Sequence, residues 1–131
     1  MKTKMIITLM VATLMLAAFP VPAFAGKPAG GGTTGPKAVV TCTYDGMNEL
    51  IKDEFTTVAK GTHSETTKVY SPDGGLYQTF TQSFTLARAG AYTVTHTLPI
   101  AGTWAETMPG AWTVRVSLDG VQLGTGGFQV N

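Results

Sequence analysis

Hydrophobic and polar residues alternate most regularly near the end of the chain. From Trp112 to Leu118, apolar residues occupy every second position and polar residues fill the positions between them. This period of two is typical of a β-strand with one buried face. Asp119-Gly120 then favours a tight hairpin turn, because both residue types tolerate a positive φ. The pattern predicts a β-hairpin whose second strand ends near Val130.

The parity of the apolar positions predicts a bulge in this last hairpin. A two-residue turn at Asp119-Gly120 makes the inward positions of the return strand odd-numbered, whereas Phe128 and Val130 are apolar and even-numbered. One extra residue changes the parity, and glycine accommodates such a bulge at little steric cost. We therefore expect the bulge within residues 124–127, where it brings Phe128 opposite Trp112.

The chain from Lys37 onward shows further short alternating segments separated by turn residues. The predicted strands before the hairpin span residues 38–44, 55–59, 63–70, 76–86 and 92–100. Residues 47–61 are the least defined, since 48–54 fit either a helical turn or the start of a strand. Pro99 indicates an edge position for its strand. About seven strands without a convincing helix predict an all-β fold, a two-sheet antiparallel sandwich.

The first 25 residues have the pattern of a secretory signal peptide. Lys2 and Lys4 precede an uncharged, mostly apolar run from residue 5 to residue 19, and Ala23-Phe24-Ala25 has the small residues of a cleavage site. The alternative is an uncleaved membrane anchor, which needs roughly 20 apolar residues. The short apolar run, the prolines that follow it and the cleavage site favour the signal peptide. We expect cleavage between Ala25 and Gly26.

Cleavage would leave two parts, a glycine-rich flexible leader at residues 26–36 and a β-sandwich domain at residues 37–131. The product would be secreted or periplasmic, with no membrane span after cleavage. Losing Lys2 and Lys4 reduces nine basic residues to seven against eight acidic ones, a net charge of about −1. No basic stripe remains to bind nucleic acid.

Several turn and core motifs carry a resemblance to a known group of domains. They are Tyr70-Ser71-Pro72-Asp73-Gly74, the run from Pro109 to Val116, Asp119-Gly120 and Phe128-Gln129-Val130. Over residues 55–130 the chain resembles the small immunoglobulin-like domains of bacterial exported proteins. The resemblance implies an immunoglobulin-like fold of about seven strands, and it carries over no catalytic residues. The Cys–Trp–Cys core of antibody domains is missing from this sequence.

One polar pair is expected inside the apolar rows. If strands 76–86 and 92–100 pair through the loop between them, with Leu86 opposite Tyr92, then Gln82 lies opposite His96. Both would stand on the core face. The pair could form a buried ligand or proton-relay site, or it could be a structural pair in which Gln82 satisfies the histidine.

The remaining reactive residue types give no constellation for chemistry. His63 stands near Glu65, but the spacing supplies no third and fourth metal ligand. Cys42 is the only cysteine, so it is either a small buried hydrophobe or an intermolecular disulfide partner. Asp53-Glu54 shows no matching partner in the sequence. We therefore expect no catalytic residue, no metal and no cofactor.

Trp104 and Met108 lie in the loop before the last hairpin and form a possible binding loop. An exposed loop tryptophan can anchor a partner, although a tryptophan can also cover the end of a sandwich. The sequence favours an exported, non-catalytic binding or accessory module that acts through its loops or edge strands on a protein of the cell envelope. The alternative is a structural subunit of a bacterial surface fibre or envelope assembly, joined by strand addition. An enzyme is disfavoured, and the oligomeric state is not predicted.

Overall fold

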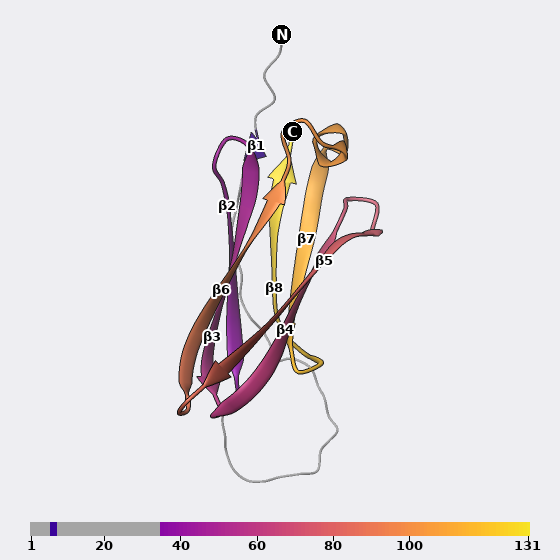
Figure 1. Ribbon diagram of the computed structural model, residues 1–131. Coiled ribbons are helices and arrows are strands. Elements are labelled where there is room, and N and C mark those ends of the chain that lie inside the picture. Colours follow the sequence, from indigo (N-terminus) through magenta and orange to yellow (C-terminus); the bar gives the residue numbers. More distant parts are fainter. Residues whose placement is uncertain (1–5, 8–34) are drawn as a thin grey trace.

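Two antiparallel sheets face each other in the part of the chain that the computed structural model describes, residues 6–7 and 35–131 (Figure 1). The larger sheet has the strand order β1-β8-β7-β4-β5 and the smaller has the order β2-β3-β6. The strands are β1 (Ile6–Ile7), β2 (Lys37–Tyr44), β3 (Asn48–Val58), β4 (Gly61–Tyr70), β5 (Leu76–Leu86), β6 (Gly90–Pro99), β7 (Gly110–Leu118) and β8 (Val121–Val130). The predicted all-β two-sheet sandwich is confirmed.

The segment that the sequence left open is strand β3, which spans Asn48–Val58 without a helical turn. Its inward positions hold Glu49 and Asp53 beside Ile51 and Phe55, and all four are buried. Because charged residues occupy two of its inward positions, this strand lacks the apolar alternation from which the sequence could have predicted it. The one helix among the described residues is a single 3-10 turn, η4 (Trp104–Thr107), in the loop before β7.

The core lies between the sheets and is built from the inward side chains of both. Trp112, Phe55, Ile51, Leu98 and Ile100 are its largest fully buried apolar members. The single cysteine, Cys42, is 2% exposed and has no disulfide partner, as expected of a small buried hydrophobe. Burial, together with the nearby charges of Glu49 and Asp53, raises the pKa of this thiol, which therefore stays neutral.

The predicted bulge in the last hairpin is present, one residue earlier than expected. Ser117 pairs with Gln122, but Val116 pairs with Gly124, so the extra residue is Leu123 and not one of residues 124–127. The glycines serve another purpose. A side chain at Gly126 would bring its Cβ within 2.8 Å of Val40 on β2, so glycine lets β2 pack closely on β8. The shifted parity places Phe128 opposite Trp112, as predicted.

The pairing expected between residues 76–86 and 92–100 is wrong. Strand β5 pairs with β4 in the larger sheet, whereas β6 pairs with β3 in the smaller one. The loop between β5 and β6 therefore crosses from one sheet to the other, and Leu86 does not pair with Tyr92. A second bulge, at Tyr77, turns that residue toward Trp112 and leaves Leu76 55% exposed. Strand β6 is an edge strand, as Pro99 indicated.

Most of the expected signal peptide and leader lies outside the described residues. The exceptions are residues 35–36 of the leader and β1, in which Ile6 and Ile7 pair with Val130 and Gln129 at the edge of β8. The expected cleavage between Ala25 and Gly26 also lies outside the described part. Among the described residues, no helix is long and apolar enough to span a membrane.

Candidate functional site

Four polar side chains meet between the two sheets, where hydrophobic residues would be expected. Asp53 comes from β3 and His96 from β6 of the smaller sheet, while Glu65 and Thr67 come from β4 of the larger one. We call these four residues the polar cluster. Asp53, Glu65 and Thr67 are fully buried, and His96 is 8% exposed. The cluster is therefore an interior site that connects the two sheets.

The strands explain why these side chains meet. Inward positions recur every second residue, so Asp53 follows Ile51 on β3, and Thr67 follows Glu65 on β4. His96 lies directly opposite Ile51 in the β3–β6 ladder, which places it close to Asp53. The phenyl ring of Phe80 on β5 stacks on the imidazole of His96, with ring centroids 4.6 Å apart. This ring covers the histidine from the side of the larger sheet.

Hydrogen bonds join the members of the polar cluster across the sheets. The Nε2 atom of His96 lies 3.0 Å from Oε1 and 3.2 Å from Oε2 of Glu65, and 3.9 Å from Oδ2 of Asp53. The hydroxyl of Thr67 lies 2.7 Å from Oδ2 of Asp53 and also contacts Oε2 of Glu65. The second oxygen of Asp53, Oδ1, is buried without a hydrogen-bond partner.

The electrostatics of the polar cluster are dominated by carboxylates. Burial raises the pKa of Asp53, the hydroxyl of Thr67 opposes this shift, and the neighbouring Glu65 adds to it. A hydroxyl has one hydrogen, so Thr67 can donate to only one of the two carboxylates that it contacts. The other contact is favourable only when a proton or another cation lies between the oxygens. The cluster therefore needs positive charge in addition to its hydroxyl.

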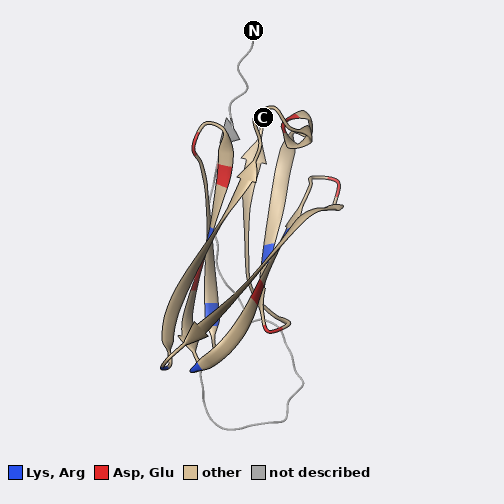
Figure 2. Cartoon of the chain, in the orientation of Figure 1, with Lys and Arg blue, Asp and Glu red and all other residues tan. Residues whose placement is uncertain are grey.

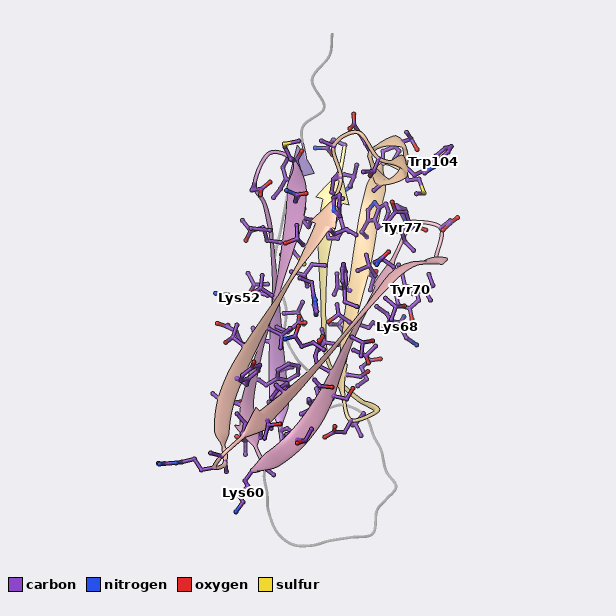
Figure 3. All side chains as sticks on the ribbon, viewed as in Figure 1. Lys52, Lys60, Lys68, Tyr70, Tyr77 and Trp104 are labelled. Carbon is purple, nitrogen blue, oxygen red and sulfur yellow. The ribbon has the colours of Figure 1, made fainter. Side chains whose placement is uncertain are left out.

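A second feature lies at the end of the sandwich, where η4 carries Trp104. The indole of Trp104 is 77% exposed and points away from the body of the sandwich (Figure 3). The turn beneath it is well held, because Ala105 is fully buried and its backbone N–H donates to the hydroxyl of Thr103 at 3.1 Å. Trp104 is therefore an exposed ring on a fixed support and does not cover the core.

The exposed surface at this end includes a second apolar side chain. Met47, in the loop between β2 and β3, is 63% exposed. Its carbonyl oxygen accepts hydrogen bonds from the backbone of Ile100 at 3.0 Å and Ala101 at 2.9 Å, which joins its loop to the segment leading into η4. Met108, in contrast, packs partly against the core, and its carbonyl accepts from the indole N–H of Trp112 at 3.0 Å.

His63, the other histidine, has a structural role near the opposite end of the sandwich. Its Nδ1 lies 2.7 Å from Oδ2 of Asp119, and its Nε2 lies 2.7 Å from the carbonyl oxygen of Ala59. Because both ring nitrogens face acceptors, the charged form is favoured, and the hydrogen bond to Asp119 raises the pKa of His63. This contact fastens the β7–β8 turn to the start of β4.

The site residues expected from the sequence have different outcomes. The expected pair of Gln82 and His96 is wrong, because β5 and β6 belong to different sheets; Gln82 is exposed and pairs with Glu65, while His96 bonds to Glu65 itself. Of the two loop residues, Trp104 is exposed and Met108 is partly buried. The sequence did not reveal Asp53, Glu65 and Thr67 as partners of the histidine. The sequence offered one indication of their burial: each lies an even number of positions from a buried residue of the same strand, and therefore on the inward face.

Acidic and basic residues are scattered over the strands and turns in the view of Figure 2, and neither kind gathers along one element. The functional candidates are thus the interior polar cluster and the exposed end around Trp104.

No protein-family model and no curated protein matches the chain. Among solved structures, it is similar to part of β-glucosidase 3B from Thermotoga neapolitana in complex with glycerol, with 17% identity and a TM-score of 0.55 over 75% of this chain. The same enzyme in complex with glucose gives 17% identity and a TM-score of 0.54 over 73% of the chain. The chain spans only 16% of the length of that enzyme. At this identity the likeness shows the fold alone, a small two-sheet antiparallel domain of immunoglobulin-like type.

Proposed function

We propose that the chain is an exported, non-catalytic binding or accessory module that captures a protein of the cell envelope through the end of the sandwich carrying Trp104. The observation behind this proposal is the exposure of that indole, 77%, on a turn anchored by a fully buried residue, Ala105. Exported bacterial proteins contain small immunoglobulin-like domains that this sequence resembles, and we propose that the chain is one of them.

Physical arguments support a binding role for this end. Tryptophan is among the residue types that dominate protein–protein binding energies, because a large rigid ring can fill a pocket of the partner and bury a large apolar surface away from water. Because the backbone turn that carries the ring is already ordered, binding through Trp104 requires little ordering of the backbone. The hydrogen bond from the hydroxyl of Thr107 to the carbonyl of Trp104, at 2.7 Å, adds to the support. Met47, in the β2–β3 loop at the same end of the sandwich, is a second exposed apolar side chain.

A capture experiment with matched variants tests the proposal. The wild-type chain, Trp104→Ala and Val121→Ala would be immobilised and incubated with envelope extract of the native organism, and the retained proteins would be compared by quantitative mass spectrometry. Val121, the first residue of β8 after the turn at the opposite end, is 60% exposed, so its variant controls for general loss of apolar surface. We expect one set of proteins to be retained by wild type and Val121→Ala and to fall at least tenfold with Trp104→Ala. Equal retention by all three would contradict the proposal.

A second candidate, a structural subunit of a surface fibre or envelope assembly, is favoured by the edge of β8. Ile6–Ile7 add to this edge as β1, which shows that its backbone can accept another strand. In an assembly, a strand from a neighbouring subunit would take this place. Size-exclusion chromatography with light scattering of the exported chain separates the candidates. A concentration-dependent series of oligomers supports the subunit, and a monomer at all concentrations excludes it.

The absence of catalysis is part of the proposal and has its own test. The histidines of the described residues are engaged in hydrogen bonds with Asp119 and Glu65, and the cysteine thiol is buried. These side chains therefore do not provide a nucleophile that is activated by a free base. A screen with chromogenic hydrolase substrates, including a nitrophenyl glucoside, should give rates equal to those of buffer. Turnover that scales with the protein concentration would overturn this part.

A further inference from the structure

We propose that the polar cluster is a structural binding site for a divalent transition-metal ion, with Zn²⁺ as the best fit, which links the two sheets of the sandwich. The ligands would be the Nε2 atom of His96 and one carboxylate oxygen each from Asp53 and Glu65. The hydroxyl of Thr67 is positioned to serve as a fourth donor. This inference is independent of the proposed binding role of Trp104.

The distances between the donor atoms suit a shared ion. One ligand atom each from Asp53, Glu65 and His96 lie within 4.8 Å of one another. Two ligands about 2.1 Å from a tetrahedral zinc ion are roughly 3.4 Å apart. The Nε2 atom of His96 lies 3.0 Å from Oε1 of Glu65 and 3.9 Å from Oδ2 of Asp53, one distance shorter and one longer than this value. Small side-chain adjustments are therefore enough to place all three around one ion.

An unpartnered atom points independently to a missing ligand. Asp53 is fully buried, and its Oδ1 atom accepts no hydrogen bond. A buried carboxylate oxygen without a partner costs folding free energy, and proteins normally pair such an atom or use it to bind a metal. Asp53 already contacts Thr67 through Oδ2, so a cation bound by this carboxylate would supply the partner that its buried Oδ1 lacks.

Charge balance also favours a divalent ion. Asp53 and Glu65 can carry two negative charges in an interior from which water is excluded, and Glu49 is buried four residues before Asp53 on the same strand. One imidazolium could neutralise only one of these carboxylates. A divalent ion bound by a neutral imidazole neutralises both Asp53 and Glu65. With the ion between them, the two carboxylates no longer depend on the single hydroxyl hydrogen of Thr67.

The donor types select the class of metal. Imidazole nitrogen with carboxylate oxygens is a common zinc ligand set, and four donors satisfy tetrahedral geometry. Ca²⁺ takes six to eight oxygens, and Mg²⁺ keeps several waters, neither of which this enclosed site supplies. Because the site is closed to solvent, the ion would have a structural role and no open position for a substrate.

The position of the polar cluster explains what such an ion would do for the fold. Its ligands come from β3 and β6 in one sheet and from β4 in the other, so the ion would connect the sheets across the core. The chain has a single cysteine and cannot form an internal disulfide. Small exported domains with a limited core are commonly stabilised by a disulfide or a metal. The metal would take the place of the disulfide.

The test begins with the wild-type chain as it is recovered after export. After incubation with Zn²⁺ and removal of free ion, we expect about one zinc per chain by elemental mass spectrometry. Thermal unfolding should then occur on the order of 10 °C higher with Zn²⁺ at 100-fold above its Kd than after treatment with a chelator. Co²⁺ bound in place of zinc should give the intense visible absorption of a tetrahedral site.

Variants then locate the ion. Glu65→Gln and Asp53→Asn should lose at least 90% of the bound zinc and the metal-dependent rise in melting temperature. The matched control is Glu54→Gln, next to Asp53 on β3 but 45% exposed, which should bind zinc as the wild type does. Chelator-treated Glu65→Gln should melt no lower than chelator-treated wild type, because it removes a buried charge.

Two results would overturn the proposal. The first is a wild-type chain that keeps less than about 0.1 zinc per chain and melts identically with and without metal; protons alone would then balance the polar cluster. The second is full zinc binding by folded Glu65→Gln and Asp53→Asn, which would place the ion elsewhere. The wild-type measurements decide the first outcome even if a variant fails to fold.

Discussion

The indole of Trp112 stacks on the phenyl ring of Phe128, with ring centroids 5.6 Å apart and the ring planes 17° from parallel. The two residues lie opposite each other in the β7–β8 ladder, and the ring of Tyr77 forms a T-shaped contact with the same indole, with ring centroids 5.0 Å apart. The bulge at Leu123 makes this pairing possible. Trp112 is therefore the aromatic centre of the core.

Trp112→Ala should lower the free energy of unfolding by about 3–5 kcal/mol, because it leaves a large cavity and removes two aromatic contacts. Urea unfolding followed by circular dichroism measures the change. Trp104→Ala is the matched control, since that indole is 77% exposed, and it should change stability by no more than about 0.5 kcal/mol. Equal losses for the two variants would show that the burial of Trp112 does not matter to stability.

The glycines of β8 permit close packing of the sheets, and Gly126→Ala tests this. The new Cβ would lie 2.8 Å from Cγ1 of Val40, so we expect a loss of about 1–3 kcal/mol in unfolding free energy. Gly90→Ala is the control, because no atom lies within 4 Å of its added Cβ. Combining Gly126→Ala with Val40→Ala should cost less than the sum of the two single changes. Additive losses would mean that the contact is not the cause.

Much of the fold could be predicted because its signals are local. The Asp119-Gly120 turn and the alternation before it determine the last hairpin, and the parity of Phe128 requires a bulge somewhere after the turn. The exact bulged residue could not be predicted, because glycine at 126 is required by contact with Val40 from another sheet. That contact is a property of the packed structure and leaves no local pattern.

The polar cluster could not be predicted for a related reason. Sequence neighbours usually pair, which favoured Gln82 as the partner of His96, but the short loop after β5 crosses to the other sheet. The true partner, Glu65, lies 31 residues earlier on β4. Nothing in the local pattern says which sheet a strand joins, so a cluster built from three strands appears only after the topology is known.

Export should remove residues 1–25. The apolar run and the Ala23-Phe24-Ala25 cleavage signature predict a mature chain that begins at Gly26. Intact-mass measurement of the periplasmic or secreted product checks this directly. Ala25→Arg is a useful variant, because a large charged residue at the cleavage point should block processing. A wild-type product that keeps Met1 and remains with the membranes would contradict the signal-peptide prediction.

The contact between His63 and Asp119 should make stability depend on pH in the acid range. Hydrogen bonds from His63 and from the backbone N–H of Ser64 lower the pKa of Asp119 below its ordinary value of 3.8. Since the folded state holds this carboxylate in its charged form, the stabilisation is present above pH 3.8 as long as His63 remains protonated. It is lost as the pH falls through the lower pKa of the folded state.

Asp119→Asn isolates this effect, because asparagine tolerates the positive φ of 51° at this turn position and can still accept from Ser64. The variant should be less stable than the wild type near pH 6, and the difference should shrink as the pH falls below 3.8. Urea unfolding at a series of pH values between 2 and 6 measures both curves. Glu54→Gln, a change at an exposed side chain on β3, controls for the loss of one negative charge. If the difference between wild type and Asp119→Asn stayed constant over the whole range, the charge of Asp119 would have no part in holding the β7–β8 turn to β4.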